Sequence, residues 1–196
     1  MSSATVSQVY VRSVLGKEPT TVVRDLLDRI GWTELVPSQG FVVIKPNFCE
    51  YSSDRIEDAN TSFLVLEALC AVLSSRTGRI AIVESDGLRY RIEDVYAEMR
   101  LERLSERYGV QLVNLTNDRT VIFSEPLLEG FPLPAILTEC DCLISVPKFK
   151  THALTYFTGA LKNQWGCIPR PDRILNKHCC PAGLERLVPG FVTAPS

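Results

Sequence analysis

The sequence predicts an α/β fold, with a predominantly parallel, doubly wound, Rossmann-like sheet and helices on both of its faces. Strand and helix patterns alternate along the chain, which is typical of parallel sheets. Residues 41–44 form a continuous apolar run, which indicates a strand covered on both faces. Ligands of such sheets bind outside the carboxyl ends of the strands, so the polar residues that follow each strand are candidates for a site.

The first quarter of the chain predicts a strand, a helix and a second strand. Residues 9–11 are expected to form the first strand, and residues 20–35 a helix with Thr20 or Thr21 as its N-cap. Apolar residues at helical spacing give this helix one buried face, and Gly31 ends or bends it. Residues 45–47, Lys-Pro-Asn, then follow the strand over residues 41–44 at its carboxyl end.

The middle of the chain repeats the alternation twice. Residues 60–75 predict a buried helix capped at Asn60 or Thr61, and Gly78 closes it before a strand over residues 79–83. A polar turn that contains Asp86 follows this strand. Residues 92–108 predict a charged amphipathic helix ended by Gly109, and residues 110–115 predict the next strand.

The last part predicts a short strand over residues 120–123, a proline-rich connection, and a buried strand over residues 143–146 that Pro147 stops. Lys148, Lys150 and His152 then alternate, so in an extended chain they project to one side. Lys162 and Asn163 follow a turn that contains Gly159.

Length and composition predict one α/β domain over residues 1–196, with an irregular region from about residue 167. The longest apolar runs are too short to cross a membrane, and the first residues lack the pattern of a secretory signal. Seven cysteines without regular spacing fit a reducing compartment. We therefore expect a cytoplasmic protein with no membrane partner.

Positive charge gathers near the end of the chain. Four of the six lysines and both histidines lie within residues 148–178, whereas the formal net charge of the whole chain is −2. A local cationic region on a mildly acidic protein favours a small anion as the ligand. A nucleic-acid partner is not expected, because such binders are more often basic overall.

The candidate site residues are those that strand ends and charge clustering bring together. As catalytic residues we expect His152, Lys162 and Asp86; as substrate-binding residues Lys45, Asn47, Lys148, Lys150, Asn163 and His178. Each has a structural alternative. The asparagines could cap turns, Asp86 beside Gly87 could be an ordinary turn residue, and a lysine is most often a solvated surface group.

Nucleotide and metal signatures are missing from the sequence. It contains neither Gly-x-Gly-x-x-Gly nor a Walker-type phosphate loop. Cys140-x-Cys142 and Cys179-Cys180-Pro181 lack the repeated spacing of an iron–sulfur binder, so a cluster held by this chain alone is not expected. The pattern predicts no metal site and identifies no cofactor.

Three motifs carry a resemblance to a known family. They are residues 43–47 (Val-Ile-Lys-Pro-Asn), residues 144–152 (Ile-Ser-Val-Pro-Lys-Phe-Lys-Thr-His) and residues 158–163 (Thr-Gly-Ala-Leu-Lys-Asn), followed by Gly166 and His178. In this order they resemble the domain-of-unknown-function-362 family of prokaryotic proteins, over roughly residues 9–180. The resemblance implies no assigned reaction. It implies that some relatives carry an attached ferredoxin-like iron–sulfur module, and that members continue into a further segment that the printed sequence does not contain.

Two hypotheses of function remain open. The first is an enzyme-type domain that binds a small carboxylate or phosphate at the strand ends, where lysines hold the anion and His152 transfers a proton. The second is a non-catalytic or truncated accessory domain that acts with an iron–sulfur or other redox partner protein. The lysine, histidine and asparagine motifs favour the first, and the missing further segment favours the second.

Overall fold

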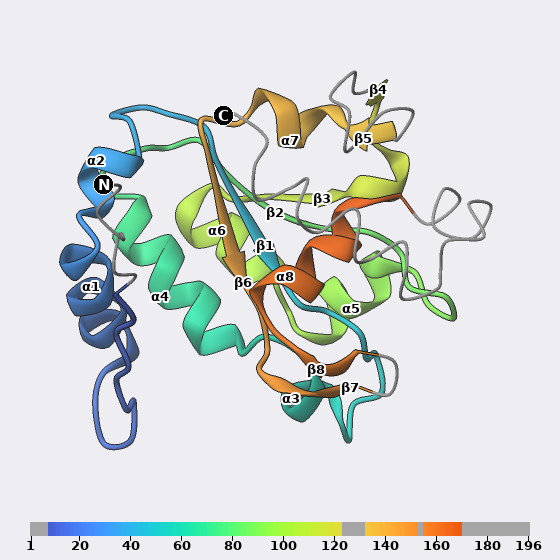
Figure 1. Ribbon diagram of the computed structural model, residues 1–196, viewed down its shortest axis with the longest axis horizontal. Coiled ribbons are helices and arrows are strands. Elements are labelled where there is room, and N and C mark those ends of the chain that lie inside the picture. Colours follow the sequence, from blue (N-terminus) through green and yellow to red (C-terminus); the bar gives the residue numbers. More distant parts are fainter. Residues whose placement is uncertain (1–7, 123–131, 153–154, 170–196) are drawn as a thin grey trace, which may run out of the picture.

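The fold is built on a parallel four-stranded sheet (Figure 1). A computed structural model describes residues 8–122, 132–152 and 155–169. Its central strands lie in the order β3-β2-β1-β6 and comprise β1 (Val42–Pro46), β2 (Ile80–Glu84), β3 (Gln111–Asn114) and β6 (Cys142–Val146). All three pairings are parallel, which confirms the predicted fold class. The order places β1, which carries Lys45, in the interior of the sheet.

The strand register brings distant motifs to one edge of the sheet. Lys45 pairs with Ser145 and Pro46 with Val146, although about 100 positions separate them in sequence. Glu84 ends β2, where it pairs with Asn114 of β3. Because parallel strands share a direction, the residues that follow β1, β2 and β6 emerge at the same edge.

One face of the sheet packs against the main hydrophobic core. Val42 and Ile44 of β1 point into this core, together with side chains of α4 (Phe63–Leu73), α5 (Ile92–Glu98) and α6 (Glu102–Tyr108). α1 (Pro19–Arg29) packs against α4 from outside. The continuous apolar strands are explained by this layer and by the helices on the opposite face.

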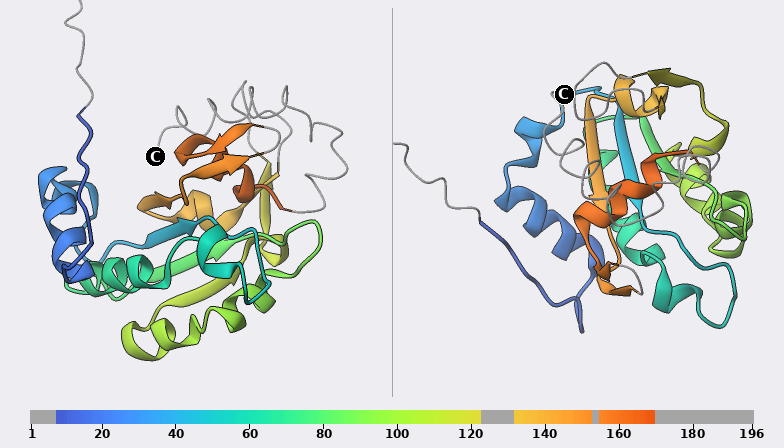
Figure 2. Two further views of the ribbon diagram at one scale, coloured as in Figure 1. Left: turned by 90° about the horizontal axis from the view of Figure 1, so that it is seen from below. Right: turned by 45° about the vertical axis from the view of Figure 1, so that its right-hand side comes forward.

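The opposite face carries a smaller apolar cluster and the elements that form the site. Val43 of β1 packs there with Ala81 and Val83 of β2 and with apolar residues of α7 (Ala135–Glu139). The short helix α8 (Ala160–Asn163) contacts β6 on this face, and Figure 2 shows α8 and α7 on the side of the sheet away from α4, α5 and α6. Lys45 is two residues from Val43 and therefore projects toward α8.

The prediction of a first strand over residues 9–11 is wrong. Residues 9–11 pair with none of the strands that the structure describes, and the side chains of Val9 and Val11 are exposed. Side-chain contacts with α1 hold this segment instead. The guanidinium group of Arg29 lies over the ring of Tyr10, and Arg12 forms an ion pair with Asp25 at 3.0 Å.

The predicted helix over residues 20–35 is two helices, because Gly31 has a left-handed backbone with φ of 66°. These are α1 and α2 (Trp32–Leu35), so the bend at Gly31 is confirmed. The predicted N-cap is wrong. Glu18 caps α1 by accepting a hydrogen bond from the backbone N–H of Thr21 at 2.8 Å.

The two later helices are also shorter than expected. α4 begins at Phe63 rather than at residue 60, because the side chains of Asn60 and Thr61 bond to other segments. The helix predicted over residues 92–108 is interrupted between α5 and α6, where Arg100 has a φ of 55°. Gly109 ends α6 in a left-handed conformation, as expected.

The remaining elements lie outside the central sheet. β4 (Thr120–Ile122) pairs antiparallel with β5 (Pro132–Pro134), a strand that the proline-rich sequence did not predict. β7 (Lys150–His152) and β8 (Tyr156–Thr158) form an antiparallel pair, and the short elements are α3 (Ile56–Ala59), η1 (Leu115–Asn117) and η2 (Gln164–Cys167). Within the described ranges, no helix is both long and apolar enough to cross a membrane.

Candidate functional site

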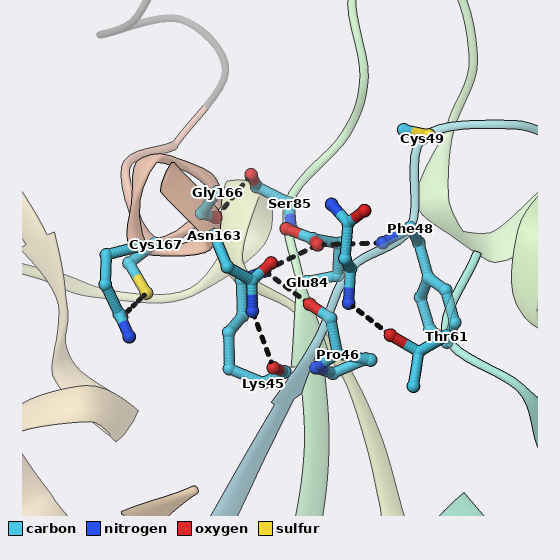
Figure 3. Close-up of polar contacts among 12 residues, drawn as sticks. Lys45, Pro46, Phe48, Cys49, Thr61, Glu84, Ser85, Asn163, Gly166 and Cys167 are labelled. Atoms are coloured by element: carbon cyan, nitrogen blue, oxygen red, sulfur yellow. Dashed lines mark hydrogen bonds and ion pairs between the residues drawn. The ribbon is translucent and has the colours of Figure 1, made fainter. Parts of the chain in front are cut away.

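Lys45 is a buried lysine at the carboxyl end of β1. Its ammonium group forms an ion pair with Glu84 Oε2 at 2.6 Å and donates to the carbonyl of Pro46 at 2.7 Å. It also donates to Asn163 Oδ1 at 3.3 Å (Figure 3). An ammonium group has three N–H donors, and these three acceptors use all of them. Direct contact between Lys45 and a substrate would therefore require one acceptor to be exchanged.

Asn163 joins α8 to two strands of the sheet. Its side-chain N–H group donates to the carbonyl of Lys45 at 2.9 Å and to Ser145 Oγ at 3.1 Å, while its oxygen accepts from the Lys45 ammonium group. Asn163 is buried, so each of these bonds satisfies a polar group removed from water. The Lys-Pro-Asn motif at the end of β1 and the Lys-Asn motif at the end of α8 thus meet in space.

Glu84 is the buried carboxylate that balances Lys45. Its Oε2 also accepts from the backbone N–H of Phe48 at 3.3 Å, and its Oε1 accepts from the backbone N–H of Ser85 at 3.0 Å. A Cβ atom added to Gly166 would lie 2.3 Å from Glu84 Oε1 and 2.9 Å from Lys45 Nζ. The ion pair therefore requires glycine at position 166. Ser85 secures this approach by donating to the carbonyl of Gly166 at 2.7 Å.

Thr61 ties the ends of β1 and β6 together. Its hydroxyl group accepts from the backbone N–H of Asn47 at 2.8 Å and donates to the carbonyl of Val146 at 2.6 Å. Asn47 is itself buried, and its side-chain oxygen has no hydrogen-bond partner among the described residues. A buried acceptor without a donor is costly, so this oxygen can receive a donor from a ligand or from water.

A second polar cluster surrounds Cys49, a residue that follows β1. The ammonium group of Lys150, on β7, donates to Cys49 Sγ at 2.6 Å and also to the carbonyl of Ala59. The thiol lies 3.5 Å from the same carbonyl. The buried side chain of Asn60 fixes this loop by accepting from the backbone N–H groups of Cys49, at 2.8 Å, and Glu50, at 3.1 Å.

Lys162 and His152 complete this cluster. Lys162 is half-buried and makes no hydrogen bond or ion pair with any residue that the structure describes. Burial lowers its pKa; Cys49 and Glu84 oppose this shift, and Lys150 and Lys45 add to it. Burial, with the nearby charges of Lys162 and Lys150, lowers the pKa of His152 below 6.5. At neutral pH the imidazole is therefore mostly neutral and can accept a proton.

A family model described as Domain of unknown function (DUF362) matches residues 42–180. The chain belongs to the DUF362 family. This confirms the resemblance read from the three motifs. The matched range begins at the first residue of β1 and includes all the candidate residues. No curated protein and no solved structure matches the chain.

Three candidates of this DUF362 domain lie elsewhere or outside the described ranges. Lys148 donates to the carbonyl of Glu57 at 3.0 Å, close to α3. Asp86 accepts from the backbone N–H of Ile92, which begins α5, and from the side chain of Asn114, both at 2.9 Å. Those bonds suit the alternative of a turn and capping residue, and catalysis by Asp86 stays a prediction. His178 lies outside the described residues.

Sequence reasoning did not single out Glu84 or Cys49 for the site, and it named Ser145 and Gly166 only as parts of motifs. Position was an available signal for Glu84 and Ser145, because both lie at the ends of predicted strands. Cys49 is only two residues beyond Asn47, but a single cysteine has no spacing pattern. Nothing in the sequence shows that Gly166 packs against an ion pair.

The described part of the chain holds no group of three histidine, cysteine, aspartate or glutamate side chains that could bind a metal ion. Cys140 follows α7 and Cys142 begins β6, while Cys179 and Cys180 lie outside the described ranges.

Proposed function

We propose that this DUF362 domain is of the enzyme type and binds a small carboxylate or phosphate anion beside the carboxyl ends of β1 and β6. The observation that carries the proposal is Lys162. It is half-buried beside other lysines and makes no hydrogen bond within the described residues. A half-buried ammonium group without a hydrogen-bond partner among the described residues is partly desolvated at a cost, and a bound anion would offset that cost.

The charge balance of the cluster supports an anion rather than a cation. Glu84 is the carboxylate that acts on Lys162, and Lys45 already neutralises it at 2.6 Å. Lys150 and Lys162 then remain as two positive charges that repel each other. A phosphate or a dicarboxylate placed between them would replace repulsion with two charge-assisted hydrogen bonds.

The proposed roles follow from exposure and bonding. Lys150 and Lys162 hold the anion, and His152 transfers a proton because it is mostly neutral at neutral pH. Lys45 and Asn163 position α8, and the unpartnered oxygen of Asn47 can accept from a substrate donor. We retain Lys148, Asp86 and His178 as substrate-binding or catalytic candidates to be tested by substitution.

Isothermal calorimetry with phosphate, sulfate and succinate tests the binding step. We expect at least one anion to bind the wild type, and Lys162→Met to weaken binding by roughly 1.5–3 kcal/mol, the usual loss for a hydrogen bond to a charged group. Lys17→Met is the matched control, because it removes one exposed positive charge from the segment before α1. Equal losses in both variants, or no binding by any anion, would contradict the proposal.

Turnover is tested through His152. A screen of reactions on the anions that bind provides the assay, and His152→Gln should then lower kcat by about 10² to 10⁴ while anion affinity changes only a few fold. Full activity in His152→Gln would move the proton-transfer role to another residue, with Lys162 the next candidate.

One observation favours the second function, an accessory domain that acts with a redox or other partner protein. Phe149 and Phe157 pack against each other beside the site at 5.8 Å between ring centroids, and both are exposed, as is Tyr156. Exposed aromatic side chains are enriched where proteins bind one another. Anion binding without turnover on any compound of the screen would favour this function over the enzyme.

A further inference from the structure

Cys49 differs from the other cysteines that the structure describes. It is exposed, whereas Cys70 and Cys167 are buried and Cys140 and Cys142 are half-buried. Burial raises the pKa of Cys70 to about 12 and that of Cys140 to about 11, so these thiols stay protonated and unreactive. Reactive cysteines lie in partly exposed, electropositive surroundings, and within the described ranges Cys49 fits this description.

Two ammonium groups act on Cys49 in different ways. The ammonium group of Lys150 donates directly to the sulfur. When the thiol gives up its proton, negative charge develops on this sulfur, and the hydrogen bond from Lys150 is already in place to stabilise it. Lys162 interacts with Cys49 through its charge but makes no hydrogen bond within the described part, so it remains available to a second group.

The position of the sulfur is fixed by the fold rather than by a loose loop. Asn60, which is fully buried, holds the backbone N–H of Cys49 at 2.8 Å and donates to the carbonyl of Glu50 at 2.7 Å. β7 delivers Lys150 to the same place, and Figure 1 shows β7 and β8 beside α3. A nucleophile needs this kind of positioning, because misplacement by about 1 Å can cost 10²-fold in rate.

We propose that Cys49 is the nucleophile of this site and reacts with small electrophiles that carry an anionic group. The inference rests on the proposed function, since Lys162 would hold the anionic group of the electrophile. In the reaction, a bond forms between Cys49 Sγ and the electrophilic carbon. The bond from that carbon to its leaving group breaks, the leaving group departs with the electron pair, and the thiol proton passes to the solvent.

Iodoacetate and iodoacetamide test this inference as a pair, because they share a leaving group and differ in charge. Rates are measured at one fixed, near-neutral pH, and mass spectrometry assigns the modification to each cysteine, including Cys179 and Cys180. We expect Cys49 to react before the other described cysteines. We also expect its iodoacetate-to-iodoacetamide rate ratio to exceed that of free cysteine by about fivefold, as a partly exposed ion pair allows.

Four lysine variants separate the two roles. Lys162→Met should lower the iodoacetate rate more than the iodoacetamide rate and so remove the preference for iodoacetate. Lys150→Met should slow both reagents by about tenfold, and Lys150→Arg should restore most of the rate because it keeps a charged donor. Lys17→Met should change neither. Circular dichroism and melting curves check that each variant is folded. If Lys150→Met does not fold, the rates of Lys150→Arg still test the role of Lys150.

The outcomes distinguish this inference from the proposed function. The inference is overturned if Cys49 is modified no faster than Cys140 or Cys142. It is also overturned if Lys150→Met is folded and does not slow the modification of Cys49. Either result counts even when calorimetry shows anion binding. A fast reaction controlled by Lys150, with no preference for iodoacetate and no anion binding, supports the nucleophile and overturns the anion site. Cys49→Ser should abolish the modification at this position, because a hydroxyl group is a far weaker nucleophile than a thiolate.

Discussion

At the scale of single residues, the buried ion pair between Lys45 and Glu84 joins the carboxyl ends of β1 and β2 at the site. Both side chains are almost fully removed from water, at 0% and 4% exposure. Removing one partner of a buried pair leaves an uncompensated charge, so we expect Lys45→Met to lower the free energy of unfolding by about 3–5 kcal/mol. Urea denaturation measures this loss.

The pair can be distinguished from a general effect of charge removal. Lys45→Met/Glu84→Gln removes both charges and should recover much of the stability that the single variant loses. Arg119→Met, which removes one partner of the exposed pair between Arg119 and Glu139, should change stability little. A double variant no more stable than Lys45→Met would show that packing of the lysine side chain matters more than its charge.

Gly166 allows a second prediction, about space rather than charge. Gly166→Ala places a methyl group 2.3 Å from Glu84 Oε1, so the ion pair or η2 must shift, and we expect a destabilisation of about 1–3 kcal/mol by urea denaturation. Gly78→Ala is the control, because a Cβ atom there meets nothing within 4 Å. Equal effects of the two substitutions would mean that η2 approaches the pair less closely than the structure indicates.

His152 gives the site a dependence on pH. Its folded-state pKa lies below the ordinary value of 6.5, because burial and the two nearby lysines disfavour its charged form. Below pH 6.5 the unfolded chain therefore binds more protons at this residue than the native chain does, and its contribution to stability falls as the pH falls. His152→Gln should flatten this acid branch of the stability curve.

The chain has only two histidines, so NMR titration can follow both and assign His152 by its loss in the Gln variant. A midpoint for His152 at or above 6.5 would contradict the desolvated, cationic surroundings described for it.

At the scale of elements, Thr61 links two strands of the sheet at the edge that carries the site. We expect Thr61→Val to cost about 1–3 kcal/mol, because the buried backbone N–H of Asn47 and the part-buried carbonyl of Val146 both lose their partner. The exposed Thr151→Val serves as a control for the change of side chain. If both variants unfold at the same urea concentration, water replaces the threonine hydroxyl group at this position.

The sequence predicted the central strands well because their apolar runs need cover on both faces, and this requirement is visible in residues 41–44. Helix ends were predicted less well. The break at Arg100 lies within a continuous amphipathic pattern, and only tertiary packing places a left-handed residue there. Thr61 looked like a helix cap because its hydroxyl group can serve either an N-terminus or a strand end. In the structure it bonds to the ends of β1 and β6.

At the scale of the whole molecule, the site combines segments that sequence alone could group only in part. The parallel sheet explains why Lys45 of β1 lies beside Ser145 of β6. Asn163 comes from helix α8 and bonds to both residues. The contact between Cys49 and Lys150 depends instead on the pairing of β7 with β8, which turns Lys150 back toward the loop after β1. No local pattern encodes that approach.

The last prediction links the site to the stability of the whole molecule. An anion that binds only the native chain must stabilise it by RT ln(1 + [L]/Kd), which is about 2.7 kcal/mol at 100 times Kd. The dissociation constant from calorimetry therefore fixes, without adjustment, how the free energy of unfolding rises with phosphate or succinate concentration. Chloride at equal ionic strength serves as the control for screening. Lys162→Met should reduce the rise in the free energy of unfolding with anion concentration, by the amount that its own dissociation constant gives. Lys17→Met should leave this rise unchanged. A stabilisation that is the same in wild type and Lys162→Met would show that the anions act on the surface in general, and would remove Lys162 from the site.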